Sequence, residues 1–284
     1  MRMHGSAGGK TQVLNIAHRG ARSVAPENTL AAARKAFALG ADMWELDAGL
    51  TADGEIVVIH DDSLTRTSDA CKTMPGRAPW RVRDFTLAEL RRLDFGSWFA
   101  ESDPFGQIAA GAVTEEELTG YARARIPTLS EALALTRELG WKVNVEIKDM
   151  GATGGDENIA RRVAALAAGM GMEDHVLVSS FRLDYLLQIR EAGSAIATAV
   201  LVSSAAQDPA ALVADLGASA YNPCLSAITL RDVAPLREKG VDVNVWTVND
   251  EETMTMLIEA EVSGIFTDFP QRLARILRKT APSQ

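Results

Sequence analysis

The sequence predicts an α/β fold, a TIM (β/α)8 barrel of parallel strands with an inserted excursion after strand two. Three observations lead to this prediction. Short apolar segments alternate with helical patterns along the chain, as in proteins built from β/α units. The 284 residues, 47% of them hydrophobic, are enough for one such barrel, which typically takes about 250 residues. Charged residues interrupt several apolar segments at the point where a strand would end, and barrels carry their chemistry at these ends.

The apolar segments define eight expected strands. They are Leu14–Ala17, Met43–Asp47, Lys142–Ile147, Val176–Ser180, Ala197–Val202, Ala220–Tyr221, Asp242–Val248 and Gly264–Thr267. An open, doubly wound sheet is the alternative. The glycine-rich segment Gly5–Lys10 does not support it, because no helix follows as a dinucleotide-binding fingerprint requires.

Helical patterns fall between most of these strands. The first is expected from about Thr29 to Leu39, with Asn28 as its N-cap and Gly40 just past its end. Leu30, Ala33 and Phe37 give this helix one apolar face. The others are expected at Ser130–Leu139, Glu157–Ala168, Leu183–Ala192, Pro209–Leu216, Leu230–Lys239, Glu251–Ala260 and Pro270–Leu277.

The region after the second strand departs from this alternation. The pair Asp53-Gly54 is a hairpin turn signal, which predicts an extra strand at Val57–Ile59 that brings His60 beside the second strand. About 65 residues, 62 to 127, then precede the next helix, too many for an ordinary connection. We interpret them as an excursion over the barrel mouth, with a decorated loop as the alternative. The expected organisation is a flexible arm at 1–12 and a single barrel domain at 13–280.

Composition limits the possible partners and location. The net charge of −9 argues against nucleic acid, since duplex binding needs a basic face. Two cysteines, Cys71 and Cys224, make no disulfide framework and favour a reducing compartment. The first twelve residues lack the apolar core of a signal peptide, and no segment approaches the ~20 apolar residues of a membrane span. A cytoplasmic protein without stable membrane insertion is expected.

Three carboxylates are expected to meet at one end of the barrel. Glu45 and Asp47 are two residues apart on a strand, so both point to one face, and Glu146 lies similarly on the next barrel strand. Inward carboxylates need a compensating cation, and all-oxygen ligation favours Mg²⁺, Ca²⁺ or Mn²⁺ over zinc. The sequence therefore predicts one divalent cation here. Salt bridges to Arg19 and Lys148 are the alternative explanation.

His18 and His60 follow strands on either side of these carboxylates. Their near-neutral titration suits general acid–base catalysis on an ester between them. Arg19 and Lys148 could bind phosphoryl oxygens, so the set as a whole suits cleavage of a phosphate ester. Trp246, near the end of the seventh strand, and Phe181, after the fourth, are expected to line the same mouth as substrate-binding residues, with plain packing as the alternative.

Nine short motifs, taken together, resemble the glycerophosphodiester phosphodiesterase family. They are HRG-(x)5-PENT (18–29), FALGAD before WELDA, the DG-x4-IHD stretch (53–61), FTLAEL, IPTLSEAL, VEIK, VSSF, WTVND and GIFTDFP. Their order and spacing cover nearly the whole chain. The sequence differs slightly from the family pattern in three places. Ala48 stands where a valine is usual, Arg66–Lys72 lacks a glycine that is often present, and the 100–125 stretch is longer than expected.

The resemblance implies a TIM barrel that hydrolyses a small-molecule glycerophosphodiester to sn-glycerol 3-phosphate and an alcohol. It implies a divalent metal on Glu45, Asp47 and Glu146, and acid–base catalysis by His18 and His60. It also implies phosphate contacts from residues that match Arg19 and Lys148, and attack by the glycerol 2-hydroxyl. Two alternatives stay open. One is a lysophospholipase D with an apolar groove in the excursion, formed by Trp80, Phe85, Trp98 and Phe99. The other is a non-catalytic phosphodiester-binding barrel.

Overall fold

The eight-stranded parallel barrel predicted from the sequence is confirmed. The computed structural model describes residues 12–149 and 158–280, so most of the expected arm and Glu157 lie outside the described residues. The barrel closes because β1 pairs with both β2 and β9. Its strands are β1 (Leu14–Ala17), β2 (Met43–Leu50), β4 (Val143–Ile147), β5 (Val176–Ser180), β6 (Ala197–Val202), β7 (Ala220–Pro223), β8 (Asp242–Val245) and β9 (Gly264–Thr267).

The register of β2 and β4 decides which side chains enter the barrel. Asp47 pairs with Glu146, so the two carboxylates start from neighbouring positions. Trp44 points the other way and stacks on Trp141 with ring centroids 6.3 Å apart, in the core between strands and helices. Side chains alternate across a strand, and Glu45 and Asp47 therefore share the inner face.

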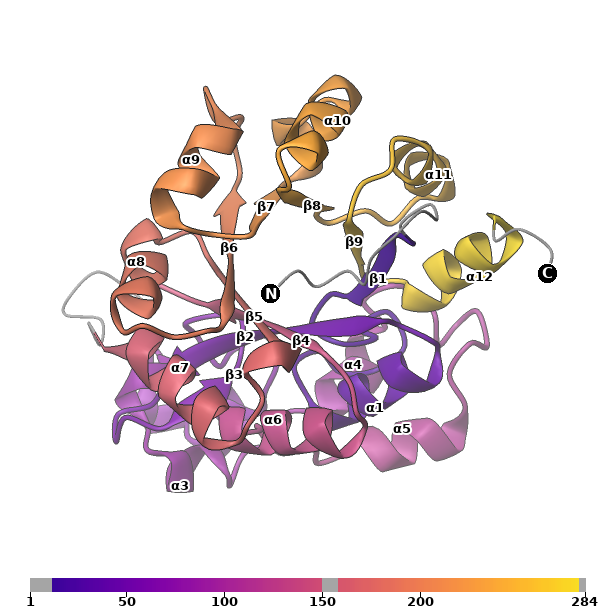
Figure 1. The fold of residues 1–284 in the computed structure, drawn as a ribbon. Coiled ribbons are helices and arrows are strands. Elements are labelled where there is room, and N and C mark those ends of the chain that lie inside the picture. Colours follow the sequence, from indigo (N-terminus) through magenta and orange to yellow (C-terminus); the bar gives the residue numbers. More distant parts are fainter. Residues whose placement is uncertain (1–11, 150–157, 281–284) are drawn as a thin grey trace.

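Helices surround the barrel as an outer ring (Figure 1). They are α1 (Leu30–Ala38), α6 (Leu129–Glu138), α7 (Ile159–Gly169), α8 (Leu183–Glu191), α9 (Pro209–Leu216), α10 (Leu230–Glu238), α11 (Glu251–Glu259) and α12 (Pro270–Thr280), with 3-10 turns η3 (Glu173–His175) and η4 (Leu225–Ala227). One expected cap is wrong. Thr29, not Asn28, caps α1 by accepting a hydrogen bond from Ala32 N, because the Asn28 side chain is bonded to Asp47.

Strand β8 ends three residues earlier than the sequence predicts. Beyond Val245 the strand pairing continues only as an isolated bridge between Trp246 and Cys224. The backbone N–H of Trp246 donates to Pro223 O. The chain then turns toward β9, where Val248 N donates to Phe266 O. The residues after Val245 therefore form the rim of the barrel and not its wall, which places Trp246 beside the mouth.

The segment between β2 and α6 forms a small packed unit. It contains β3 (Ile56–Val58), which pairs antiparallel with β2, then α2 (Ala70–Thr73), η1 (Pro75–Arg77), η2 (Val82–Asp84), α3 (Leu87–Leu90), α4 (Ser97–Ser102) and α5 (Glu115–Tyr121). Phe85 and Phe99 are fully buried in hydrophobic cores, so the apolar groove expected for a lysophospholipase D is not formed from them. Phe105 lies against Phe269 (5.5 Å between centroids) and Arg22, which places this part of the segment beside the end of β9.

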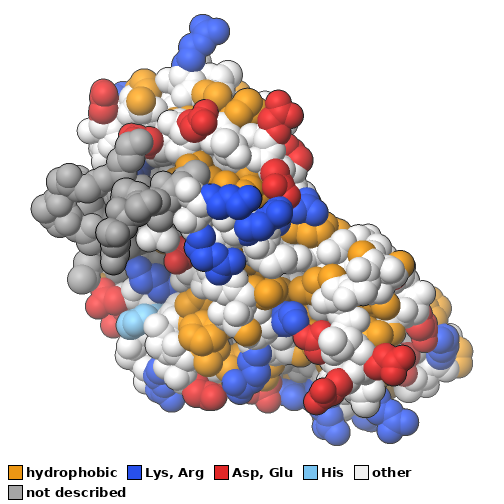
Figure 2. Space-filling model, turned by 90° about the vertical axis from the view of Figure 1, so that its right-hand side faces the viewer, with side chains coloured by type: hydrophobic (Ala, Val, Ile, Leu, Met, Phe, Trp, Pro, Cys, Tyr) orange, Lys and Arg blue, Asp and Glu red, His pale blue; other side chains and the backbone are white. Residues whose placement is uncertain are grey.

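Within the described residues, no helix is both long and apolar enough to cross a membrane. On the face shown in Figure 2, acidic and basic side chains are interspersed with small apolar patches, and a group of Lys and Arg side chains lies near its middle.

Candidate active site

A cavity of about 140 Å³ opens at the carboxyl ends of the barrel strands. It collects all but one of the nine residues that the sequence analysis selected. The exception, Asp47, is almost completely buried beneath the cavity. The lining residues are His18, Arg19, Glu45, His60, Asn144, Glu146, Lys148, Ser179, Phe181, Leu201, Trp246, Thr247 and Phe266.

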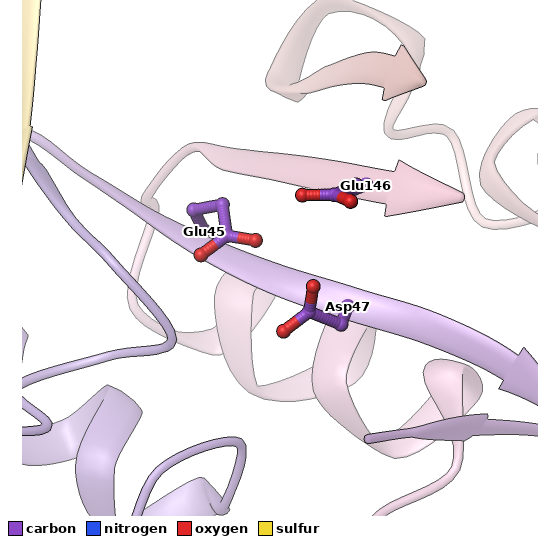
Figure 3. Close-up of side chains that lie close together, drawn as sticks. All are labelled: Glu45, Asp47 and Glu146. Atoms are coloured by element: carbon purple, nitrogen blue, oxygen red, sulfur yellow. The ribbon is translucent and has the colours of Figure 1, made fainter. Parts of the chain in front are cut away.

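Glu45, Asp47 and Glu146 turn their carboxylates toward one another from β2 and β4 (Figure 3), and one oxygen from each lies within 4.8 Å of the others. Burial and mutual repulsion raise the pKa of Glu45 and of Glu146. Burial also opposes ionisation of Asp47, but Arg19 and Lys148 outweigh it and lower its pKa. Together the three groups form a site of concentrated negative charge.

Two cations balance part of this charge. Lys148 Nζ lies 2.8 Å from Glu146 Oε1 and 3.6 Å from Asp47 Oδ1. Arg19 Nε lies 3.4 Å from Asp47 Oδ2, and its backbone N–H donates to Glu45 Oε2 at 2.7 Å. The salt bridges that the sequence offered as an alternative to a metal are therefore present. They still leave some of the carboxylate oxygens without a hydrogen bond.

The carboxylate oxygens that lack a hydrogen bond fit a hard cation. Glu45 Oε1 and Asp47 Oδ1 are buried and accept no hydrogen bond from the described residues. An unsatisfied buried carboxylate oxygen is costly, and a divalent ion with oxygen ligands would satisfy both of these atoms and relieve the repulsion from Glu146. The residues present thus fit the expected divalent cation.

The loop after β1 is shaped to bring Arg19 into this site. Arg19 and Asn28 both adopt the left-handed backbone conformation (φ 55° and 56°). Between them, a Cβ at Gly20 would lie 2.7 Å from Ala32, so the close approach of this loop to α1 requires a glycine. Asn28 then donates to Asp47 Oδ2 at 2.8 Å and accepts from the Asp47 backbone N–H. The HRG and PENT motifs therefore support one face of the carboxylate cluster.

His18 lies at the cavity wall with one ring nitrogen already engaged. Its Nδ1 is 2.7 Å from Asp268 Oδ1, and Asp268 follows β9, the strand next to β1. Burial and the nearby charges of Arg19 and Arg22 lower the pKa of His18, although Asp268 acts in the opposite direction. The lowered pKa favours the neutral ring, which is the form in which a histidine can accept a proton.

His60, which lines the same cavity, is held in the same manner. Its Nδ1 is 2.6 Å from Asp61 Oδ1, and Arg66 binds both oxygens of Asp61, at 2.7 and 3.1 Å. Burial opposes ionisation of Asp61, but its contacts with His60 and Arg66 lower its pKa well below its usual range. Each of the two histidines thus has an ionised carboxylate at Nδ1.

Glu27 connects these parts of the site. Its buried carboxylate binds Arg19 at 2.9 Å, Arg22 at 2.8 Å and Arg66 at 2.8 Å. Sequence reasoning assigned no role to Glu27 or Asp268, although both lie in quoted motifs. For Asp268 a signal existed, because it is a charged residue directly after a strand that neighbours β1 in a closed barrel.

An apolar wall faces the charged side of the cavity. The rings of Phe181 and Trp246 meet edge to face, 5.6 Å between centroids, and the Trp246 Nε1–H donates to Asn222 O at 2.8 Å. Phe181 is 45% exposed, and both rings line the cavity. Both residues therefore expose apolar ring atoms to a ligand bound in the cavity.

The chain was compared with known proteins. Residues 18–272 match the glycerophosphoryl diester phosphodiesterase family. The chain belongs to this family. A glycerophosphodiester phosphodiesterase from Caldanaerobacter subterraneus is 32% identical over 270 residues, covering 94% of this chain and 99% of the relative. The resemblance seen in the sequence is thereby confirmed, and with it the expectation of a phosphodiesterase.

Solved structures give the same result. An Oleispira antarctica phosphodiesterase in complex with the product sn-glycerol-3-phosphate superposes with a TM-score of 0.74 at 28% identity, over 95% of this chain and 97% of that one. A glycerophosphodiester phosphodiesterase from Agrobacterium tumefaciens superposes with a TM-score of 0.70 at 26% identity, over 92% and 98% of the two chains. The family's barrel is therefore shared over nearly the full length of this chain.

Proposed function

We propose that this phosphodiesterase hydrolyses glycerophosphodiesters to sn-glycerol 3-phosphate and an alcohol, with His18 and His60 as the acid–base pair. The observation that carries the proposal is their placement. Two carboxylate-bound histidines line one cavity together with Glu45 and Glu146, and Asp47 lies buried beside these two carboxylates. The product bound by the Oleispira antarctica relative supports glycerol phosphate as the part of the substrate that is retained.

Glu45, Asp47 and Glu146 would hold one divalent cation, Mg²⁺, Ca²⁺ or Mn²⁺. Bound there, the cation would supply Lewis-acid polarisation of the phosphoryl oxygens. Arg19 and Lys148 already neutralise part of the carboxylate charge, and both line the cavity. They would bind the non-bridging oxygens of the phosphodiester and stabilise the charge that builds on them.

One histidine removes a proton from the attacking hydroxyl and the other donates a proton to the departing alkoxide. The attacking group is the 2-hydroxyl of the glycerol, which is tethered to the phosphorus and so has a high effective concentration. Its attack releases the alcohol and leaves a cyclic glycerol phosphate, and a water molecule then opens this ring to give sn-glycerol 3-phosphate. Phe181 and Trp246 would contact the carbon atoms of the substrate and exclude water from that side of the mouth.

A product assay tests this function. Purified protein is stripped of metal with EDTA and given glycerophosphocholine with Mg²⁺, Ca²⁺ or Mn²⁺. The expected result is release of choline and sn-glycerol 3-phosphate that depends on added metal. Full turnover after exhaustive chelation would contradict the metal, and lysophosphatidylcholine as the better substrate would favour a lysophospholipase D. Binding of glycerophosphocholine without turnover under all metal conditions would instead indicate a phosphodiester-binding barrel.

A further inference from the structure

Two motifs near the end of the chain, WTVND and GIFTDFP, contribute Asn249 and Asp268, which have no role in the function above. We propose that Asp268, held by Asn249, positions His18 in the tautomer that carries its proton on Nδ1. Nε2 is then left as a proton acceptor on the side of the cavity. The catalytic use of Nε2 rests on the proposed function, whereas the tautomer itself does not.

Asp268 and His18 are in direct contact, and Asp268 is buried. Asp268 is 5% exposed, and its Oδ1 lies 2.7 Å from His18 Nδ1. Burial opposes ionisation of Asp268, but its contacts with His18, Arg22 and Asn249 outweigh it and keep its pKa below the usual value. An ionised carboxylate can only accept hydrogen bonds. The hydrogen in this contact must therefore be carried by Nδ1 of His18.

Hydrogen bonds fix the orientation of the Asn249 side chain. Its Oδ1 accepts from the Asp268 backbone N–H at 2.9 Å and from Thr267 Oγ1 at 3.2 Å. Thr267 Oγ1 in turn accepts from the Phe269 backbone N–H at 3.0 Å, so its hydrogen is directed to Asn249. With its oxygen fixed by two donors, Asn249 must present Nδ2 to Asp268 Oδ2, 2.7 Å away.

Both oxygens of Asp268 are consequently used as acceptors. Oδ1 accepts from His18 and, at 3.5 Å, from Arg22, and Oδ2 accepts from Asn249. An amide at position 268 has only one oxygen. Because Asn249 cannot turn over without losing two hydrogen bonds, the oxygen of D268N would face Asn249 and its NH₂ would face His18. A donor at this place stabilises the ring with an unprotonated Nδ1 and moves the proton to Nε2. D268N is therefore expected to fold with His18 in the wrong tautomer.

The tautomer is measured directly by long-range ¹H–¹⁵N NMR of the imidazoles at about pH 8, above the ordinary pKa of histidine. The His18 signals are assigned by their loss in H18Q. The expected result is Nδ1–H in the wild type and Nε2–H in D268N. An Nε2–H ring in the wild type overturns the proposal, as does an unchanged Nδ1–H ring in folded D268N.

A second variant provides a rescue that packing alone would not produce. In D268N/N249D the introduced carboxylate accepts from the amide at 268, which leaves that amide's oxygen free to accept from His18 Nδ1–H. The double variant should regain the Nδ1–H tautomer, whereas N249D alone places two carboxylates in contact and should not reproduce the wild type. Failure of the double variant to restore Nδ1–H, in protein that folds, also overturns the proposal.

Kinetics connect the tautomer to turnover. D268N should lower kcat by about 10²–10⁴-fold, the contribution of a general acid–base group, with little change in KM, and the double variant should recover part of the loss. D242N is the matched control, because Asp242 forms a similar ion pair with Arg237 at the start of β8. If the tautomer shifts as expected but H18A turns over normally, the proposed function of His18 fails while the positioning by Asp268 stands.

Discussion

Arg66 binds both carboxylate oxygens of Glu27, at 2.8 and 3.0 Å, and so joins the inserted segment to the loop after β1. The same carboxylate contacts Arg19 and Arg22, and Arg66 also holds Asp61, the partner of His60. Glu27 therefore connects the surroundings of both histidines. We therefore expect a change at Glu27 to lower the stability of the fold and to disturb the surroundings of both histidines.

E27Q should destabilise the fold. Burial opposes ionisation of Glu27, but Arg66, Arg19 and Arg22 outweigh it and hold its pKa well below its usual range. Removing one partner of a buried ion pair leaves its counter-charges unpaired and costs about 3 kcal/mol or more. Urea unfolding at neutral pH measures this loss. E252Q, an exposed position in the first turn of α11, is the control and should unfold like the wild type.

The pH dependence of stability should change in the same variant. Because the pKa of Glu27 is lower in the folded protein than in the unfolded chain, where it is about 4.3, its contribution is complete above that value. The contribution is lost as the pH falls toward the folded pKa. The difference between wild type and E27Q should therefore shrink below about pH 4. A difference that is constant from neutral to acidic pH would show that the loss comes from packing and not from charge.

Metal binding should stabilise the wild type and not E45Q. Burial and mutual repulsion raise the pKa of Glu45 and Glu146, and a bound cation would remove that repulsion. At a metal concentration 100 times Kd, linkage adds about 2.7 kcal/mol to the wild type, which raises Tm by several degrees. Thermal unfolding with and without Mg²⁺ or Ca²⁺ measures the shift. The control E252Q should keep the full shift, and an equal shift in E45Q would exclude this carboxylate as a ligand.

The two histidines should act on one transition state. H18A and H60A are each expected to lower kcat by at least ~10²-fold. Loss of the second histidine should add much less than its effect alone, because groups that act as a unit are not additive. H175A is the matched control, since His175 is exposed at the amino end of β5, at the opposite end of the barrel. An H60A protein with nearly normal kcat would reduce His60 to a packing residue.

Most of the site could be predicted because its residues directly follow recognisable strands. Glu45, Asp47 and Glu146 need only the alternation of a strand and the closure of a parallel sheet. The partners of the histidines differ in predictability. Asp61 adjoins His60 in the chain, whereas Asp268 is 250 residues from His18 and only the pairing of β1 with β9 brings them together.

The capping error at α1 has a similar origin. Asn28 and Thr29 are both good N-cap residues, and local sequence does not distinguish them. The choice is made by Asp47, which binds Asn28 and leaves the cap to Thr29. The sequence also left open whether the phenylalanines of the inserted segment form a groove, because an apolar residue in a long segment can pack inward or line a surface. The small core around Phe85 decides in favour of packing.

The last prediction concerns the nucleophile. Among the described residues that line the cavity, Ser179 and Thr247 carry hydroxyl groups. The Ser179 oxygen accepts a hydrogen bond from Asn144 at 2.9 Å, and the side-chain partners of the two cavity histidines are carboxylates, not these hydroxyls. A protein nucleophile activated by a neighbouring base is thus not indicated.

We expect the glycerol 2-hydroxyl to attack, so a 2-deoxy analogue should bind through its phosphate to Arg19 and Lys148 yet react very slowly. Competition against glycerophosphocholine measures its binding, and phosphorus NMR of the parent reaction should show an early cyclic phosphate that later decays. A 2-deoxy substrate that is hydrolysed nearly as fast as the parent would favour direct attack by water. It would also extend the substrate range to phosphodiesters that lack this hydroxyl.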